Sequence, residues 1–243
     1  MNEDREENEK PGHRDAVVSR VPFFYGWVML PVAMLIQIST SPGQTFGVSV
    51  FNPFIRASLS LSQSAFSGAY TLGTLLASFP QTYVGAWMDR FGLRRTLAVV
   101  VLIFGLACFG MSQVTGVFSL FVAFFFLRML GQGAMGLLSA NTVAMWFNRR
   151  LGSTSGVMSI GMAVASGGMP AFGLWLIGGF GWRWAYVILG VLVWAMMLPV
   201  LGIFYRNKPE DVGQIPDGKP DPKRSAQHAQ PTRSYSLPEA MRT

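Results

Sequence analysis

The chain has 243 residues, of which 51% are hydrophobic and 13% are charged. Soluble domains carry about 25% charged residues, and the mean hydropathy of +0.37 is high for a soluble protein. Only nine charged residues lie between Val21 and Tyr205, and one of them is acidic. This distribution excludes an ordinary soluble core and predicts a membrane core between two solvated tails.

The net charge of +7 does not indicate a nucleic-acid partner, because the arginines lie a few at a time between apolar runs. Cytoplasmic loops of membrane proteins collect Lys and Arg, which explains the excess. The lone Cys108 lies in an apolar run, and the two histidines, His13 and His228, lie in the tails. The sequence therefore predicts no metal site and no cofactor.

The chain opens with MNEDREENEKPGHRDAVVSR, which has neither the short basic region nor the small-residue cleavage site of a signal peptide. We predict a disordered cytoplasmic tail over 1–21. A transmembrane domain is expected over 22–205, followed by a cytoplasmic linker or tail over 206–243.

Six segments are apolar enough to cross a membrane, for which a helix needs about 20 residues. They are 23–50, 64–87, 96–113, 117–147, 153–178 and 184–205. The predicted fold class is therefore all-α: a polytopic membrane protein built as a bundle of six transmembrane helices.

The positive charge between these segments is uneven. Most of it follows the even-numbered segments: Arg90, Arg94, Arg95, Arg149, Arg150, Arg206 and Lys208. The opposite side has only Arg56 and Arg183. By the positive-inside rule, we expect an integral protein of the cell membrane with both termini in the cytoplasm.

The fourth segment contains a full charge near mid-membrane, since Arg128 lies about 15 Å into the helix. Gln132, Ser139 and Thr142 fall within roughly 40° of it on a helical wheel. A charge at this depth is unfavourable unless it faces water or a partner. Two interpretations stay open: this stripe lines a substrate cavity, or Arg128 is structural and pairs with backbone carbonyls or a distant carboxylate.

The first segment carries a second polar stripe, made of Gln37, Ser41 and Gln44. Pro42 and Gly43 lie within it and are expected to bend or loosen the helix. The stripe belongs either to the same cavity or to helix–helix hydrogen bonds.

Small residues recur at spacings that let membrane helices approach closely. The set is Gly131, Gly133, Gly136, Gly152, Gly156, Ala163 and Gly167. We expect them to serve packing within the bundle.

Residues 85–95 read GAWMDRFGLRR. The stretch resembles the loop motif G-x-x-x-D-R-x-G-x-R-R of the major facilitator superfamily, between the second and third helices. Six positions match: Gly85, Asp89, Arg90, Gly92, Arg94 and Arg95. The resemblance implies a gating loop, in which the aspartate caps a helix terminus in the other half of the transporter and the arginines bridge to nearby helix ends. These contacts would latch the cytoplasmic side and break as the two halves rock.

Residues 146–161, WFNRRLGSTSGVMSIG, are similar to the monocarboxylate transporter signature at the start of the fifth helix. The matching positions are Trp146, Phe147, Arg149, Arg150, Gly156 and Gly161. Met158 and Ile160 stand where that signature usually has alanines. YGWVM (25–29), FGVSVF (46–51) and RNKPEDVGQIPDG (206–218) also resemble this family and the oxalate/formate antiporters, although Tyr25 replaces a usual acidic residue.

The resemblance covers about residues 22–218, which correspond to one half of a twelve-helix fold that surrounds a midplane site. The final SYSLPEAMRT is similar to the linker before the seventh helix, so we expect a truncated or split transporter. In the resembled transporters the principal carboxylate-binding cations lie in the other half. Arg128 lies near the arginine of the superfamily's fourth-helix motif, with Gly131 and Gly133 offset from that motif.

These features predict a secondary transporter half for small organic anions such as monocarboxylates, which works by alternating access. Its partners would be the lipid bilayer, the anion with a coupled proton or counter-anion, and a second half or a second copy. The alternative is a non-transporting six-span protein that acts as a scaffold or subunit. An enzyme is not expected, since no intramembrane His, Asp or Cys–His cluster is present in the sequence.

Overall fold

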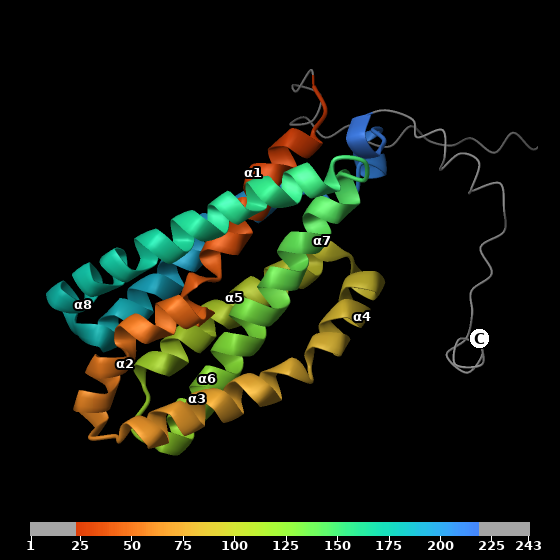
Figure 1. Ribbon diagram of the computed structural model, residues 1–243. Coiled ribbons are helices and arrows are strands. Elements are labelled where there is room, and N and C mark those ends of the chain that lie inside the picture. The colour runs from red at the N-terminus through yellow and green to blue at the C-terminus, as the bar shows by residue number, and fades with distance from the viewer. Residues whose placement is uncertain (1–22, 219–243) are drawn as a thin grey trace, which may run out of the picture.

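The computed structural model describes residues 23–218, and every regular element in that range is a helix. The helices lie lengthwise beside one another in an elongated bundle (Figure 1). The all-α class is therefore confirmed for the described residues. The predicted tail over 1–21 and the stretch 219–243 lie outside them.

The first predicted span consists of two helices joined by a short break. α1 (Gly26–Ser39) ends before the 3₁₀ turn η2 (Ser41–Gly43), and α2 (Thr45–Leu59) follows. Pro42 has no N–H with which to continue an α-helix, and Gly43 has no side chain to hold one. The bend predicted at this pair is confirmed.

The second predicted span is also interrupted. α3 (Gln63–Ser78) and α4 (Gln81–Phe91) are separated at Pro80. Ser62 is the N-cap of α3, and its hydroxyl accepts a hydrogen bond from the Ala65 N–H at 3.1 Å. The interruption was not predicted, because an apolar window that contains one proline still reads as a single membrane helix.

The third and fourth predicted spans are well matched by the structure. α5 (Leu93–Ser112) is followed by α6 (Val117–Leu127), a π-helix, η3 (Arg128–Met135), and α7 (Gly136–Trp146). The last three form one continuous rod. A π-helix has i→i+5 hydrogen bonds and more residues per turn than an α-helix, and hydrophobicity does not reveal it.

The fifth and sixth predicted spans are joined in α8 (Leu151–Ile203), which folds back at Gly181. This residue has φ 76° and ψ 162°, a backbone conformation that is essentially restricted to glycine. The chain then ends its described part with two 3₁₀ turns, η4 (Glu210–Val212) and η5 (Pro216–Gly218).

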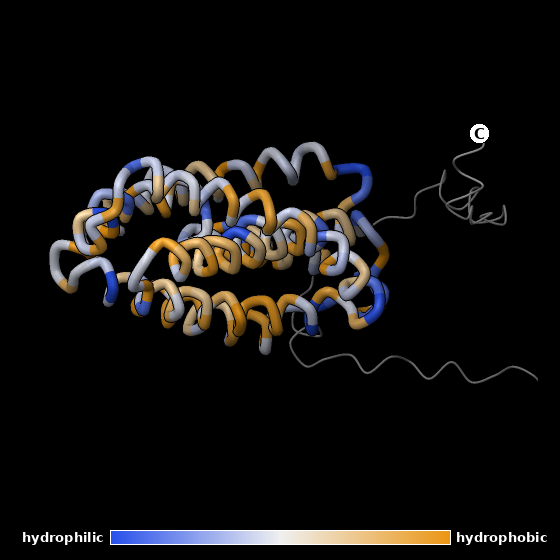
Figure 2. Tube along the Cα trace, turned by 90° about the horizontal axis from the view of Figure 1, so that it is seen from below, coloured by the Kyte–Doolittle hydropathy of each residue, from blue (hydrophilic) through white to orange (hydrophobic). Residues whose placement is uncertain are grey.

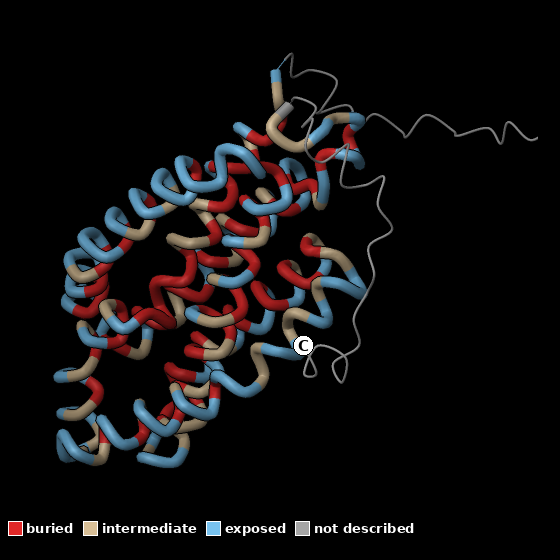
Figure 3. Tube along the Cα trace, turned by 45° about the vertical axis from the view of Figure 1, so that its right-hand side comes forward, coloured by how far each residue is buried: buried red, intermediate tan, exposed pale blue. Residues whose placement is uncertain are grey.

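Buried residues gather between the helices, and the outer helix faces are exposed (Figure 3). Among the largest fully buried side chains are Phe51, Phe104, Trp146 and Tyr186. Many large apolar side chains are nevertheless exposed, and strongly hydrophilic residues gather mainly at the helix ends (Figure 2). Within residues 23–218, three helical stretches are long and apolar enough to cross a membrane: Leu93–Ser112, Val117–Trp146 and Leu151–Ile203.

The expected packing role of the small residues in α8 is not seen within residues 23–218. A Cβ atom placed on Gly152, Gly156 or Gly167 would meet no described atom within 4 Å. Ala163 is also exposed. The spacing therefore marks a smooth outer face of α8 rather than a helix–helix contact in this part of the chain.

Replacing Gly181 by alanine should destabilise the fold, because the turn requires a backbone conformation that a Cβ atom opposes. We expect Gly181→Ala to lower the free energy of unfolding by about 1–3 kcal/mol. Gly178→Ala is the matched control, since Gly178 is helical and its Cβ would meet open space. Denaturant unfolding followed by circular dichroism in detergent measures both, and equal effects would contradict the turn's role.

Candidate functional site

The break in the first span and the π-helix cross at two glycines. A Cβ atom on Gly43 would lie 3.2 Å from the Gly131 Cα, and a Cβ on Gly131 would lie 3.2 Å from the Gly43 Cα. A Cβ on Gly43 would also overlap the Leu127 carbonyl oxygen, and one on Gly131 would come within 2.7 Å of the Phe104 ring. Only residues without side chains allow the two backbones to come this close.

Arg128 is held directly beside this crossing. Its side chain is 6% exposed, and Nη1 donates to the Gly43 carbonyl and to the Thr45 hydroxyl, both at 3.2 Å. The guanidinium carbon lies 5.1 Å from the centre of the Tyr70 ring. Nε is buried without a hydrogen-bond partner, and no carboxylate within residues 23–218 pairs with the group. A full positive charge therefore remains in the middle of the bundle.

Two of the groups around Arg128 were not predicted. The Thr45 and Tyr70 hydroxyls lie 2.9 Å apart, so α2 and α3 are linked at the point that the guanidinium contacts. Tyr70 also packs edge-on against Phe124, with ring centres 5.4 Å apart. A tyrosine in an apolar span is a weak sequence signal, because most such residues lie at membrane interfaces.

A side chain from the second span bonds the backbone of the π-helix. Gln81 Nε2 donates to the Met129 carbonyl at 2.9 Å and to the Ala77 carbonyl at 3.2 Å. The same amide contacts Gly133, where any side chain would displace it. π-Helical turns inside α-helices are frequent at functional sites, so this part of the rod is where we look for binding.

The predicted stripe of the fourth span is divided by the π-helix. Ser139 is buried and donates to the Ala33 carbonyl at 2.9 Å. Thr142 is buried, donates to the Leu138 carbonyl at 2.8 Å and lies 2.6 Å from the Tyr205 hydroxyl. Gln132 is instead exposed. The prediction of one continuous stripe was wrong because a wheel of 100° per residue does not describe a π-helix.

The polar residues of the first span also separate. Ser41 donates to the Ile38 carbonyl at 2.5 Å, and buried Gln44 donates to the Thr40 hydroxyl at 3.0 Å. Gln37 is half-buried and lines a cavity of about 370 Å³ between α1, α7 and the first part of α8. The cavity has two further polar side chains, Ser155 and Ser159.

The motif resembling a gating loop is mostly helical. α4 continues to Phe91 and α5 begins at Leu93, so Gly92 is the only residue between them. Gly92 has φ 81° and ψ 158°, which explains the glycine at this position. The expectation of a longer loop over 85–95 was wrong, because one glycine suffices to reverse the chain.

The motif arginines differ in their surroundings. Arg94 donates from Nε to the Leu201 carbonyl at 3.1 Å and from Nη2 to the Gly202 carbonyl at 2.8 Å, at the end of α8 where carbonyls lack helical partners. Asp89, Arg90 and Arg95 are exposed, and Gly85 is half-buried. No hydrogen bond joins Asp89 to any residue of the described range.

The segment 206–218 ties three parts of this same end together. Asn207 Oδ1 accepts from the Arg94 N–H at 2.7 Å. Gln214 Oε1 accepts from the Tyr25 N–H at 2.8 Å. Asp217 Oδ2 accepts from the backbone N–H groups of 148 and 149, at 3.0 and 2.7 Å, just before α8 begins. We call this segment the strap, and the end of the bundle that it covers the strap end.

Comparisons with known proteins agree on one family. The family model described as Major Facilitator Superfamily matches residues 24–238. The chain is 32% identical over 145 residues to a multidrug resistance protein B homolog of Mycobacterium tuberculosis (strain CDC 1551 / Oshkosh). The matched region covers 58% of this chain and 26% of that relative. The chain is also 24% identical over 177 residues to the probable sulfoacetate transporter SauU of Cupriavidus necator, and this match covers 69% of this chain and 39% of that relative. The chain thus spans well under half the length of either relative.

Gly131→Ala should weaken the crossing, because the added Cβ would meet the Phe104 ring and the Gly43 backbone. We expect a loss of about 1–3 kcal/mol in the free energy of unfolding. Gly136→Ala in the same rod is the control, since its Cβ meets open space and alanine favours helix. Unfolding in detergent measures both variants, and a loss for the control as large as that for Gly131→Ala would contradict the close approach.

Asp217→Ala should release the strap from the start of α8. The carboxylate accepts two backbone N–H groups just before α8 begins. We expect their loss to lower stability by about 0.5–2 kcal/mol, as the loss of a helix cap does. We expect faster hydrogen exchange at the amides of 148 and 149. Glu210→Ala is the control, because Glu210 is exposed and makes no side-chain hydrogen bond within the described range. Unchanged exchange in Asp217→Ala would show that the strap is not held by this carboxylate.

Proposed function

The chain belongs to the major facilitator superfamily, and from this premise we propose that it forms one six-span half of a secondary transporter for small organic anions. It is an integral membrane protein, and members of this family are transporters rather than enzymes. The remaining half would be supplied by further chain, as the longer relatives suggest, or by a second copy. Transport would follow alternating access, coupled to a proton or a counter-anion.

Six crossings are supported by the lengths of the helical segments. The 53 residues of α8 would measure about 80 Å if straight, whereas the hydrocarbon core is about 30 Å thick. The turn at Gly181 divides α8 into two arms of crossing length. The pairs α1–α2 and α3–α4 are interrupted only at η2 and at Pro80, so each pair supplies one crossing.

The observation that carries the anion proposal is the buried, unneutralised Arg128. Its hydrogen-bond partners are a carbonyl and a hydroxyl, which leave the charge in place, and its Nε has no hydrogen-bond partner within the described residues. An ionisable residue inside a membrane bundle is by default a candidate for a substrate pathway. The relative named for sulfoacetate is consistent with an organic anion, and monocarboxylates are the narrower class that we propose to test.

The cavity beside Gln37 is the proposed place for the rest of the substrate. Its volume of about 370 Å³ is within the range of small-molecule sites, and Met158 and Met162 can adapt to an apolar part. Exposed Gln132 would supply a further hydrogen bond. Ser41, Gln44, Ser139 and Thr142 bond within the bundle, so their proposed role is to hold the wall of the cavity.

The strap end would be the cytoplasmic gate. Asp89, Arg90 and Arg95 are exposed there and would face the second half, whereas Arg94 holds α5 to the end of α8. Gly85 would let the facing helix approach, and Gly92 would turn the chain. In this arrangement both termini are cytoplasmic, with a solvated tail over 1–21, the membrane domain over 22–205 and the linker over 206–243.

Binding can be tested separately from transport. Organic anions should raise the unfolding temperature of the purified chain, since a ligand of the folded state stabilises it. Sulfoacetate, oxalate and lactate would be titrated against the wild type, Arg128→Ala, Arg128→Lys and the control Arg56→Gln, which removes a half-buried cation in the last turn of α2. We expect Arg128→Ala to weaken binding at least about tenfold, in line with the loss of one charge-assisted contact.

Uptake of the same labelled anions into proteoliposomes then tests transport, for this chain alone and for a version with a second half. Arg128→Lys should retain more binding than Arg128→Ala, because it keeps the charge without the planar guanidinium. Undiminished binding and uptake in Arg128→Ala would overturn the proposed role of this residue.

A further inference from the structure

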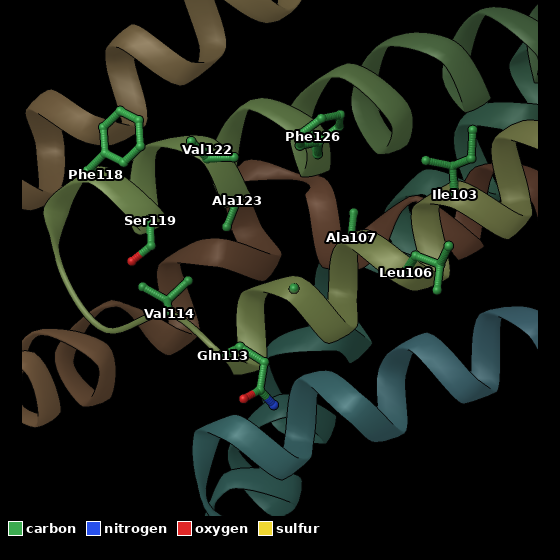
Figure 4. A pocket seen from close by; sticks show the side chains of 11 residues that line it. Ile103, Leu106, Ala107, Gln113, Val114, Phe118, Ser119, Val122, Ala123 and Phe126 are labelled. Carbon is green, nitrogen blue, oxygen red and sulfur yellow. The ribbon is translucent and has the colours of Figure 1, made fainter.

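A second cavity lies on the outside of the bundle, between α5 and α6 (Figure 4). Its volume is about 560 Å³, and its walls are apolar along most of their length. Ile103, Leu106 and Phe126 lie toward one end of this groove (Figure 4). The two polar side chains of the lining, Gln113 and Ser119, lie at the other end, where α5 stops and α6 starts. The groove therefore has an apolar body and one polar mouth.

The length of the groove matches one leaflet of a bilayer. Ile103 and Gln113 are ten residues apart, which corresponds to about 15 Å along a helix, or half of a hydrocarbon core of about 30 Å. Both walls belong to stretches that are long and apolar enough to cross a membrane, so we place the groove within the hydrocarbon region. The mouth would then lie at the end of α5, and the apolar end at Ile103 would lie near mid-membrane.

A cation stands at the polar mouth. Arg183 donates from Nη1 to the Ser112 carbonyl at 2.5 Å, immediately before Gln113, and its guanidinium carbon lies 4.3 Å from the centre of the Trp182 ring. The side chain is only half-buried, and no carboxylate of residues 23–218 pairs with it. Gln113 is exposed, and Figure 4 shows its amide directed toward α8, the helix that carries Arg183.

We propose that this groove binds one acyl chain of an anionic phospholipid, with the lipid phosphate held by Arg183 and Gln113. Apolar walls alone do not select a lipid, because acyl chains are as apolar as the side chains that they would contact. Selection comes from the charge at the mouth, since a basic residue near a membrane surface favours anionic lipids. The guanidinium can donate to the phosphate through the N–H groups that Ser112 does not use. The site is independent of the substrate cavity and of the transport proposal.

The test is retention of lipid by the purified full chain. The protein is equilibrated in detergent with equal amounts of phosphatidylglycerol and phosphatidylcholine of identical acyl chains, and the retained lipid is counted by native mass spectrometry. The wild type should retain phosphatidylglycerol over phosphatidylcholine by roughly fivefold, which corresponds to about 1 kcal/mol for one cation. Arg183→Gln should bring this ratio close to one, and Arg183→Lys should preserve most of it.

Two further variants separate the groove from the charge. Gly110→Leu narrows the groove, and the Cβ atom of the new side chain meets no described atom within 4 Å. It should reduce the retained phosphatidylglycerol while Arg183 stays in place. Arg56→Gln removes a cation that does not line the groove and should leave the ratio unchanged. Equal retention of the two lipids by the wild type would overturn the proposal. So would full retention in Gly110→Leu, or an effect of Arg56→Gln as large as that of Arg183→Gln.

Discussion

The close approach of Gly43 and Gly131 is the constraint on which the centre of the bundle depends. It brings the break of the first span against the π-helix of the fourth, so that the Gly43 carbonyl comes within reach of Arg128. An α-helix through residues 41–43 would bond that carbonyl within its own backbone. The 3₁₀ break and the π-helix thus act together. The break leaves the Gly43 carbonyl free to accept a hydrogen bond, and the π-helix places the Arg128 guanidinium where it can donate that bond.

Several contacts between elements elsewhere also join a side chain to a backbone carbonyl. Ser139 bonds the Ala33 carbonyl, Gln81 bonds the Met129 carbonyl, and Trp194 donates to the Val101 carbonyl at 3.0 Å. Because no water reaches the hydrocarbon region, a polar group there is stabilised when it finds a partner within the protein. Carbonyls are suitable acceptors since each retains a second lone pair after the helical bond. Such contacts fix helix positions without adding charge. The charge of Arg128 therefore dominates the electrostatic field in this part of the bundle.

The sequence predicted the positions of the helices better than the contacts that their polar side chains make. Hydropathy predicted where the helical stretches lie, and the glycine–proline pair predicted the bend at Pro42, since both signals act over the local backbone. The sequence did not reveal the π-helix, whose backbone Gln81 bonds from the second span, and the helical wheel therefore misplaced Gln132. The contacts of Tyr70 and the hydrogen bonds of the strap were missed for a related reason. Their partners lie far away in the sequence, and the local residue pattern does not indicate which residues they are.

Arg128 and Arg183 use one arrangement at two depths. Each guanidinium donates to a backbone carbonyl and lies against an aromatic ring, Tyr70 in the first case and Trp182 in the second. A carbonyl and a ring orient the group but do not neutralise it, unlike a carboxylate. Arg128 is buried beside the crossing of Gly43 and Gly131, where a low dielectric strengthens electrostatic interactions. Its charge would therefore attract an anion that enters the bundle before the two are in contact. At the end of α5 the charge of Arg183 is partly screened by water, so it acts only on a group that comes into contact with it. The depth of the residue, rather than its chemistry, therefore separates the proposed site for a diffusing anion from the proposed site for a lipid headgroup.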